Sequence, residues 1–214
     1  TGLQFHWHNN NYKTFDDFLN ELKSSKRKAI RNERKKIKNT NLVIEKLTGE
    51  QITDEIWDSF YNFYLNTIDK KWGGAYLTKE FFYLLNETMK NDILLITAKQ
   101  EEKVVAGALN FISKNTLYGR NWGSIVNIPF LHFELCYYQA IEYAIEKKIK
   151  VVEAGAQGHH KIQRGYIAKP TYSNHFLLNN SFAKAIKKFT KLEEIEVSKQ
   201  IEFINTENSP YSNI

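Results

Sequence analysis

Residues 151–166 gather many chemically active groups in one short stretch of the chain. The apolar run 149–152 predicts a buried strand, and it ends just before the polar part of the segment. Three glycines in the segment permit positive φ angles and a close approach of the backbone to a ligand. Because α/β proteins place binding and catalytic groups on loops at strand ends, we interpret this segment as one wall of a site, the alternative being an ordinary surface loop. The side chains concerned are Glu153, Gln157, His160, Lys161 and Arg164.

These side chains offer proton transfer and anion binding. His160 is expected to act as a proton shuttle, since an imidazole titrates near neutral pH. Lys161 and Arg164 are three residues apart and could clamp an anion if the loop becomes helical. Gln157 is a further candidate for contact with the substrate.

Two glutamates are candidates for a general base. Glu134 lies in the first turns of a predicted helix, where it could take a proton from an attacking amine. His132, a candidate substrate-binding residue, lies two positions earlier, so the two side chains diverge by about 200° around the helix. Glu153 leaves the apolar strand where a site would open and could act instead. We prefer Glu134, and a role limited to complementing the helix dipole stays open.

A second group of candidates lies on one predicted strand. Tyr118, Arg120 and Trp122 alternate along it, so they are expected to share one face. Arg120 could bind a phosphate or carboxylate through two N–H groups, with the aromatic rings stacked on the ligand. The alternative is a half-buried strand face with a snorkelling arginine.

Positive charge is concentrated in one predicted helix. The net charge is +6, and residues 23–38 hold nine lysines and arginines against one glutamate. Such a stripe could neutralise the phosphates of tRNA or of another polyanion, whereas a solvated helix is the usual fate of charge runs. The residues expected to bind the anion are Lys26, Arg27, Arg31, Arg34 and Lys35.

Composition excludes several classes of protein. The single cysteine, Cys136, rules out an internal disulfide and suits a reducing compartment, so we expect a cytoplasmic protein. No apolar run approaches the roughly 18 residues of a membrane span. Six scattered histidines without a thiolate cluster give no reason to expect a metal. The chain begins Thr-Gly-Leu and its only methionine is Met89, so we expect a fragment of a longer protein.

Periodicity predicts one α/β unit, with a turn at Trp72-Gly73-Gly74. The order of helices, a meandering hairpin, a central helix and a final strand is that of the GNAT acyltransferase fold, and a strand–helix–strand unit near its end favours a parallel pair. We expect residues 1–41 to form a strand and a basic helical arm, and residues 42–214 a GNAT-like domain with a mixed sheet flanked by helices. The expected strands are 3–7, 42–47, 93–98, 104–112, 117–122, 149–152 and 173–178, and the expected helices are 14–22, 24–38, 53–64, 78–89, 129–148 and 182–203.

Several strings together resemble the FemAB-like predicted N-acyltransferase family of the GNAT superfamily, which is labelled peptidoglycan biosynthesis/recognition. They are SSKRKAIRNERKK, LYGRNWG, LHFELCYYQAIE, EAGAQGHHKIQRGY and PTYSNHF. The resemblance spans nearly the whole chain, with His159 standing where an acidic residue is expected. It implies transfer of an acyl or aminoacyl group to an amine.

The donor stays open. GNAT enzymes usually bind the pyrophosphate of coenzyme A with a glycine-rich loop before the central helix, and residues 121–129 hold only two small residues together, Gly123 and Ser124. Acyl-CoA is therefore not favoured, and aminoacyl-tRNA or another activated acyl carrier is at least as compatible. The alternative function is a non-catalytic module that binds nucleic acid or a cell-wall precursor through the basic helix. Oligomeric state is not predicted.

Overall fold

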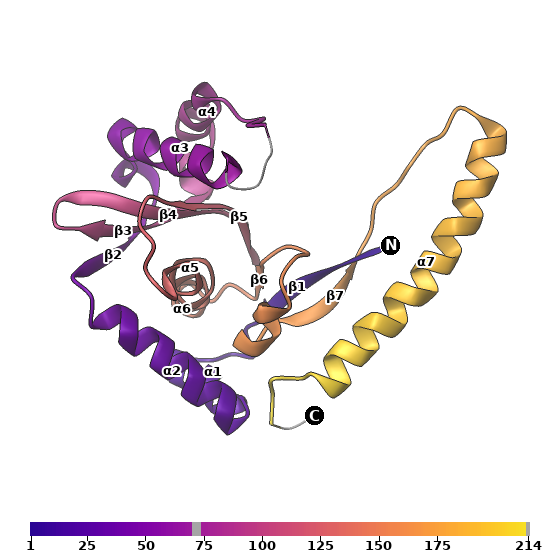
Figure 1. Ribbon diagram of the computed structural model, residues 1–214, viewed down its shortest axis with the longest axis horizontal. Coiled ribbons are helices and arrows are strands. Elements are labelled where there is room, and N and C mark those ends of the chain that lie inside the picture. The colour runs from indigo at the N-terminus through magenta and orange to yellow at the C-terminus, as the bar shows by residue number, and fades with distance from the viewer. Residues whose placement is uncertain (70–73, 213–214) are drawn as a thin grey trace.

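The computed structural model describes residues 1–69 and 74–212, which form a mixed sheet flanked by helices (Figure 1), as predicted. The strands of these residues are β1 (Gly2–His8), β2 (Leu42–Leu47), β3 (Ile93–Gln100), β4 (Lys103–Ile112), β5 (Thr116–Ser124), β6 (Val151–Glu153) and β7 (Ile167–Thr171). The α-helices are α1 (Phe15–Glu21), α2 (Ser24–Lys38), α3 (Asp54–Asp69), α4 (Lys79–Met89), α5 (Leu131–Phe133), α6 (Gln139–Glu146) and α7 (Asn180–Glu207). A π-helical segment, Glu134–Tyr138, joins α5 to α6, and 3₁₀ helices cover Gly49–Gln51, Lys90–Asp92 and His159–Arg164.

Local hydrogen bonds explain where helices begin. The hydroxyl oxygen of Thr14 accepts the N–H of Asp17 at 3.1 Å, and the Asp17 carboxylate accepts the N–H of Thr14 at 2.9 Å. This is the capping box predicted at the start of α1. At α7, the side chain of Asn179 accepts the N–H of Phe182 at 2.9 Å. Each cap satisfies an N–H group that the helix itself leaves without a partner.

The sheet combines an antiparallel meander with one parallel pair. Its strand order is β2-β3-β4-β5-β6-β1-β7. The predicted parallel pair is formed by β5 and β6, and the other neighbours are antiparallel. The first strand of the chain lies inside the sheet, between β6 and β7. Residues 1–41 therefore contribute an interior strand, and a domain boundary at residue 41 stays a prediction.

The parallel strands β5 and β6 soon part. They pair only from Thr116↔Val151 to Tyr118↔Glu153. β5 then continues beside β4 with an irregular register, in which Arg120 is an extra residue between the pairs Asn110↔Gly119 and Leu109↔Asn121. The chain after β6 turns away through Gly155, whose φ of 75° suits glycine. The separation of the two strands opens the middle of the sheet.

Apolar side chains fill both faces of the sheet. One core lies between the sheet and α1, α2 and α6, and the other lies between the sheet and α3 and α4. Gly123 permits the close approach of α3, because a Cβ there would lie 2.2 Å from the carbonyl oxygen of Phe63. The helices on the two faces therefore flank the point where β5 and β6 separate.

Some predicted elements differ from the structure. The last strand is β7, at residues 167–171, whereas the predicted strand at 173–178 is irregular. β7 contains Pro170, which a strand tolerates at the edge of a sheet, where an N–H is not needed on the outer side. The strand predicted at 149–152 begins at Val151. The predicted turn Trp72-Gly73-Gly74 lies, except for Gly74, outside the described residues.

Candidate functional site

A cavity of about 660 Å³ lies where β5 and β6 separate. Its walls come from both faces of the sheet, since α3 supplies Tyr64 and Thr67 on one side and the helical stretch after β5 supplies His132 and Tyr137 on the other. β5 and the loop of residues 154–161 form the remaining walls. Of the predicted site residues, the cavity brings together Arg120, Trp122, His132, Gln157, His160 and Lys161.

His160 and Tyr137 form the polar pair of this cavity. The Tyr137 hydroxyl oxygen lies 2.9 Å from Nε2 of His160. Partial burial, and then the positive charges of Arg164 and Lys161, lower the pKa of His160 below its usual value. Burial raises the pKa of Tyr137, so its hydroxyl keeps its proton at neutral pH. A neutral imidazole beside a protonated hydroxyl can pass a proton between the cavity and the ring.

Gly158 makes room for the imidazole. Its φ is 97°, and a Cβ on it would lie 2.4 Å from Cε1 of His160. His132 lies close by, with its ring centroid 6.1 Å from that of His160 and 5.2 Å from that of Trp122. The neighbouring His159 packs edge-on against Phe5 and does not line the cavity.

Lys161 is a buried amine at the cavity wall. Its Nζ donates to the carbonyl oxygens of Ala154 and of Gly155, the latter at 3.3 Å. Burial lowers the pKa of Lys161 to about 8. Among the described residues no carboxylate lies within 4 Å of it. These bonds hold the backbone that turns away from β5.

Arg164 does not form the predicted clamp with Lys161. A 3₁₀ helix does form here, but Arg164 is buried on its other side and donates to Glu33 of α2 at 2.7 Å and 2.9 Å. Its Nη1 also donates to the carbonyl oxygen of His160 at 2.7 Å, and its guanidinium stacks 3.4 Å from the ring centroid of Phe133. Its charge is thus used to fix the loop to α2.

The three candidates on β5 do not share one face of the site. Arg120 and Trp122 line the cavity, and Nη2 of Arg120 donates to the Tyr76 hydroxyl at 3.4 Å. Tyr118 lies outside the cavity wall, because at its position β5 is still paired with β6. The extra residue at Arg120 also interrupts the alternation on which the prediction depended.

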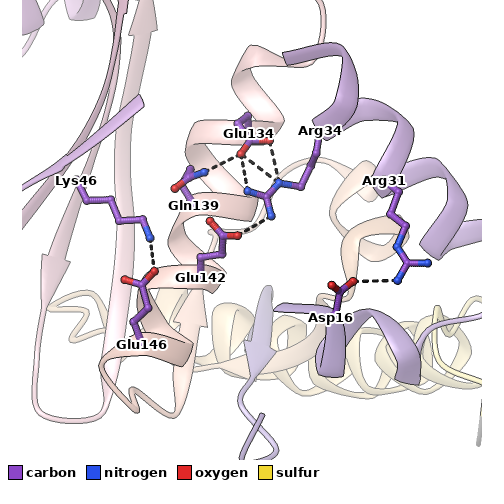
Figure 2. A network of polar contacts seen from close by, with 8 residues as sticks. All are labelled: Asp16, Arg31, Arg34, Lys46, Glu134, Gln139, Glu142 and Glu146. Atoms are coloured by element: carbon purple, nitrogen blue, oxygen red, sulfur yellow. Dashed lines mark hydrogen bonds and ion pairs between the residues drawn. The ribbon is translucent and has the colours of Figure 1, made fainter. Parts of the chain in front are cut away.

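Glu134 faces α2 and not the cavity, which corrects its expected role as general base. It is 3% exposed, and one of its carboxylate oxygens lies 3.0 Å from Nη2 of Arg34. Gln139 donates a further bond to it at 2.8 Å. Figure 2 shows Arg34 between Glu134 and Glu142, the second carboxylate lying 2.7 Å from Nη1. The predicted divergence from His132 is present, and it points Glu134 away from the site.

Glu153 also lies off the cavity wall. It pairs with His6 of β1 inside the sheet, and its carboxylate lies 3.9 Å from Nε2 of that histidine. Burial raises the pKa of Glu153. The raised pKa would suit a base, but the side chain is not in the cavity.

The basic helix is largely committed to contacts within the protein. Arg31 pairs with Asp16 at 2.9 Å (Figure 2). Arg27 donates to two carbonyl oxygens before α2, and Lys26 donates to Gln163. Arg27 and Arg34 therefore face the protein, while Arg31 and Lys35 are exposed, and anion binding by this helix stays a prediction. Both inward-facing arginines alternate with the buried Ile30 and Ile37 along the packing face of the helix.

Tyr137 was not among the predicted site residues. Its position in the helix assigns it to an apolar face, and its ring does contact the buried Tyr166. Its hydroxyl end nevertheless reaches the cavity from the π-helical segment, a feature often found at functional sites. Cys136 also lines the cavity, and burial raises the pKa of its thiol, as befits a packing residue.

A second hollow of about 710 Å³ adjoins the first. It is lined by the connection between β5 and α5, and it shares Thr67, Trp122 and His132 with the cavity. In the described part of the chain, no three His, Cys, Asp or Glu side chains are placed to hold a metal ion. No described helix is both long and apolar enough to cross a membrane.

Solved structures share the fold of this chain, a mixed sheet flanked by helices. FemX aligns with a TM-score of 0.58 and 11% identity, over 78% of this chain and 59% of FemX. A conserved Bacteroides thetaiotaomicron protein of unknown function aligns with a TM-score of 0.51 and 17% identity, over 72% of this chain and 50% of that one. The C-terminal domain of a putative lysylphosphatidylglycerol synthetase from Agrobacterium fabrum gives a TM-score of 0.52 and 11% identity, over 72% and 46%. At these identities the likeness shows the fold alone.

The chain belongs to the FemAB-like family, described as peptidoglycan biosynthesis/recognition, which matches residues 1–213. No curated protein sequence matches it significantly. The chain spans only about half the length of the solved structures it resembles, 50% of the Bacteroides protein and 59% of FemX.

Proposed function

We propose that this chain is an N-acyl or aminoacyl transferase that joins an activated acyl group to an amine in the β5–β6 cavity. The observation that carries the proposal is the Tyr137–His160 pair, which lines the cavity with its two polar atoms 2.9 Å apart. The family description favours a peptidoglycan precursor as the molecule that supplies the amine.

The two adjoining hollows suit a reaction with two substrates. They meet at Trp122 and His132, so groups bound in each could touch there. Arg120, exposed at the cavity beside Tyr76, is suited to hold a phosphate or carboxylate of one substrate. Holding two reactants in contact removes most of the entropy cost of bringing them together.

The Tyr137–His160 pair supplies a path for the amine proton. A neutral amine attacks the acyl carbonyl carbon, so that a C–N bond forms and the bond from carbon to the carrier breaks. The amine proton passes to the Tyr137 oxygen while Tyr137 passes its own proton to Nε2 of His160. The carrier then leaves with the proton that His160 returns. A neutral His160 is required at the start, and its lowered pKa provides it at neutral pH.

The residues before α5 suit coenzyme A poorly as the carrier of the acyl group. A pyrophosphate needs several free backbone N–H groups in a glycine-rich loop. Gly123, the one glycine of residues 121–129, lies in β5 and is used for packing against Phe63 of α3. We therefore favour an acyl ester such as aminoacyl-tRNA as donor. A non-catalytic module that binds through α2 has less support, since Arg27 and Arg34 are engaged within the protein.

Single substitutions in the pair test the proposal. Purified chain is incubated with an amine-bearing peptidoglycan precursor and either aminoacyl-tRNA or acyl-CoA, and the product is measured by mass spectrometry. His160→Gln and Tyr137→Phe should each reduce the rate roughly 10²–10⁴-fold, as expected for loss of proton transfer. His159→Gln is the matched control and should leave the rate unchanged, because His159 lies outside the cavity. Equal rates in His160→Gln and the parent chain would refute the mechanism.

A further inference from the structure

The amino-terminal half of α7 exposes large apolar side chains. Phe182, Phe189 and Leu192 are 54–60% exposed and repeat at helical spacing, so they form one stripe. The irregular segment before the helix adds Phe176 and Leu178, each 89% exposed. Figure 1 shows this half of α7 standing away from the sheet. We refer to these five residues as the α7 apolar stripe.

Only the other half of α7 is firmly anchored. Ile204 is buried, and the side-chain amide of Asn205 makes two bonds of 2.9 Å with the backbone of Ala168 in β7. The amino-terminal half carries no residue with a comparable degree of burial. Packing onto the protein therefore does not explain its exposed aromatic groups, and apolar patches of this kind mark interaction sites.

The charges on α7 are divided between its two halves. Residues 180–192 contain four lysines and no acidic residue, whereas residues 193–207 contain five glutamates and one lysine. This is the reverse of the order that the helix dipole favours, which is acidic side chains near the start and basic ones near the end. Helix stability thus gives no reason for the lysines. The four lysines are Lys184, Lys187, Lys188 and Lys191.

Three of the four lysines lie along one flank of the α7 apolar stripe, whereas Lys187 faces the hollow between α7 and residues 1–2. At 100° per residue, Lys188 lies about 40° from Leu192 around the helix axis, and Lys184 and Lys191 lie on the same flank. A long lysine side chain can extend its ammonium group to a phosphate while its methylene groups remain beside apolar neighbours. An apolar stripe with a lysine flank is the pattern of helices that lie in the surface of an anionic bilayer.

We propose that the amino-terminal half of α7, with the segment before it, docks on an anionic phospholipid surface. The apolar stripe inserts at headgroup level, and Lys184, Lys188 and Lys191 contact lipid phosphates. A polyanion such as nucleic acid would neutralise the lysines but would leave Leu178 and Leu192 exposed, so a bilayer satisfies both sets of side chains. The contact is peripheral, since α7 is too polar to cross a membrane. It does not depend on the proposed transferase activity.

Vesicle sedimentation tests this docking. The chain should sediment with vesicles made of equal parts phosphatidylglycerol and phosphatidylcholine, and not with pure phosphatidylcholine. Binding should weaken as salt is added. The triple variant Phe182→Ser/Phe189→Ser/Leu192→Ser should bind at least roughly tenfold more weakly, from loss of the inserted apolar groups. Its control is Val43→Ser/Leu84→Ser, which removes apolar groups of similar exposure, 56% and 55%, on β2 and α4.

Charge reversal provides an independent variant in case the serine substitutions disturb folding. Lys184→Glu/Lys188→Glu/Lys191→Glu should weaken binding to the anionic vesicles roughly a hundredfold, since each lysine near the surface adds attraction. Lys28→Glu/Lys35→Glu/Lys38→Glu on α2 makes the same change in net charge and should have a much smaller effect. Failure of the parent chain to bind, or equal losses from the α7 and α2 reversals, would overturn the proposal. So would a dimer that the serine variant converts to monomers, because the stripe would then be covered by a second copy.

Discussion

Arg34 and Glu134 form a buried ion pair across the packing face of α2, with Nη2 of the arginine 3.0 Å from a carboxylate oxygen. The same guanidinium reaches Glu142, and Gln139 donates to Glu134, so the charges are satisfied within the protein (Figure 2). The pair fixes α2 to the helical stretch that supplies Tyr137 and His132 to the cavity. It is therefore a structural element of the site without being part of its chemistry.

Removal of Arg34 should destabilise the protein strongly. Arg34→Met leaves two carboxylates unpaired, one of them in the interior, and breaking a buried pair in this way costs about 3–5 kcal/mol. The measurement is the free energy of unfolding in urea. Arg31→Met is the control, because its pair with Asp16 is exposed and should contribute at most about 1 kcal/mol. Equal losses in the two variants would contradict the role given to Arg34.

Glu134→Gln should separate stability from catalysis. The amide cannot balance the charge of Arg34, so the free energy of unfolding should fall. The transfer rate of the folded fraction should stay close to that of the parent chain, because Glu134 does not reach the cavity. Parallel urea unfolding and transfer assays measure the two effects. Loss of the rate in a chain that is still folded would restore Glu134 as a candidate base.

Residue patterns predicted most elements but not the partners of charged side chains. The capping box at Thr14 and the meander follow from local signals and short connections, and the parallel pair follows from the order strand, helix, strand. Arg34 and Glu134 are a hundred positions apart, and their pairing depends on how α2 packs. Likewise, Arg27 and Arg34 were expected in a solvent-facing stripe, because the apolar residues that share their face of the helix, Ile30 and Ile37, are so few.

The loop of the candidate site was predictable because its groups are contiguous, whereas Tyr137 was not. Gln157, His160 and Lys161 follow a strand in a segment that also contains glycines. This combination is enough to indicate a site. Tyr137 fits an apolar helix face, and its hydroxyl becomes relevant only when the loop folds over it. The predicted strand at 173–178 failed for a related reason, since pairing with β1 selects residues 167–171 despite Pro170.

The pH dependence of transfer should report His160. Its pKa is lowered, so the imidazole loses its proton below the usual pH of about 6.5. The rate constant kcat/KM should therefore rise as His160 loses its proton, and the midpoint of this rise should lie below pH 6.5. In His160→Gln this limb should be absent, which a series of initial rates over the acid range would reveal. An unchanged midpoint in the variant would assign the limb to another group.

Stability should also depend on pH through the partly buried His6. Burial, and then the charges of His8 and Lys169, lower its pKa from 6.5 to about 4. Glu153 at 3.9 Å is too distant for a hydrogen bond and offsets little of this. Between these two pH values the unfolded chain binds a proton that the folded chain does not, so the free energy of unfolding falls as the pH is lowered.

Acidification from pH 6.5 to about 4 should lower the free energy of unfolding by up to roughly 3 kcal/mol. Above pH 6.5 His6 is neutral in both the folded and the unfolded chain, so no stability is lost there. His6→Gln should flatten the pH dependence of urea unfolding over this range. His175→Gln replaces an exposed histidine and should leave the slope as it is. The same slope in both variants and in the parent chain would show that His6 is not the titrating group.

Gly158→Ala should impair the site by displacing His160. The new Cβ would lie 2.4 Å from Cε1 of the imidazole, so the ring has to move away from Tyr137. This substitution strains the backbone and also displaces the ring, and Gly155→Ala separates the two effects. A Cβ at Gly155 is also strained, because φ is 75°, at a cost of about 1–2 kcal/mol. Nothing lies within 4 Å of that Cβ, so no side chain is displaced. In transfer assays on chains matched for folded fraction, Gly158→Ala should lose most of the activity while Gly155→Ala retains more. Equal activities would mean that backbone strain alone, and not the position of His160, limits the reaction.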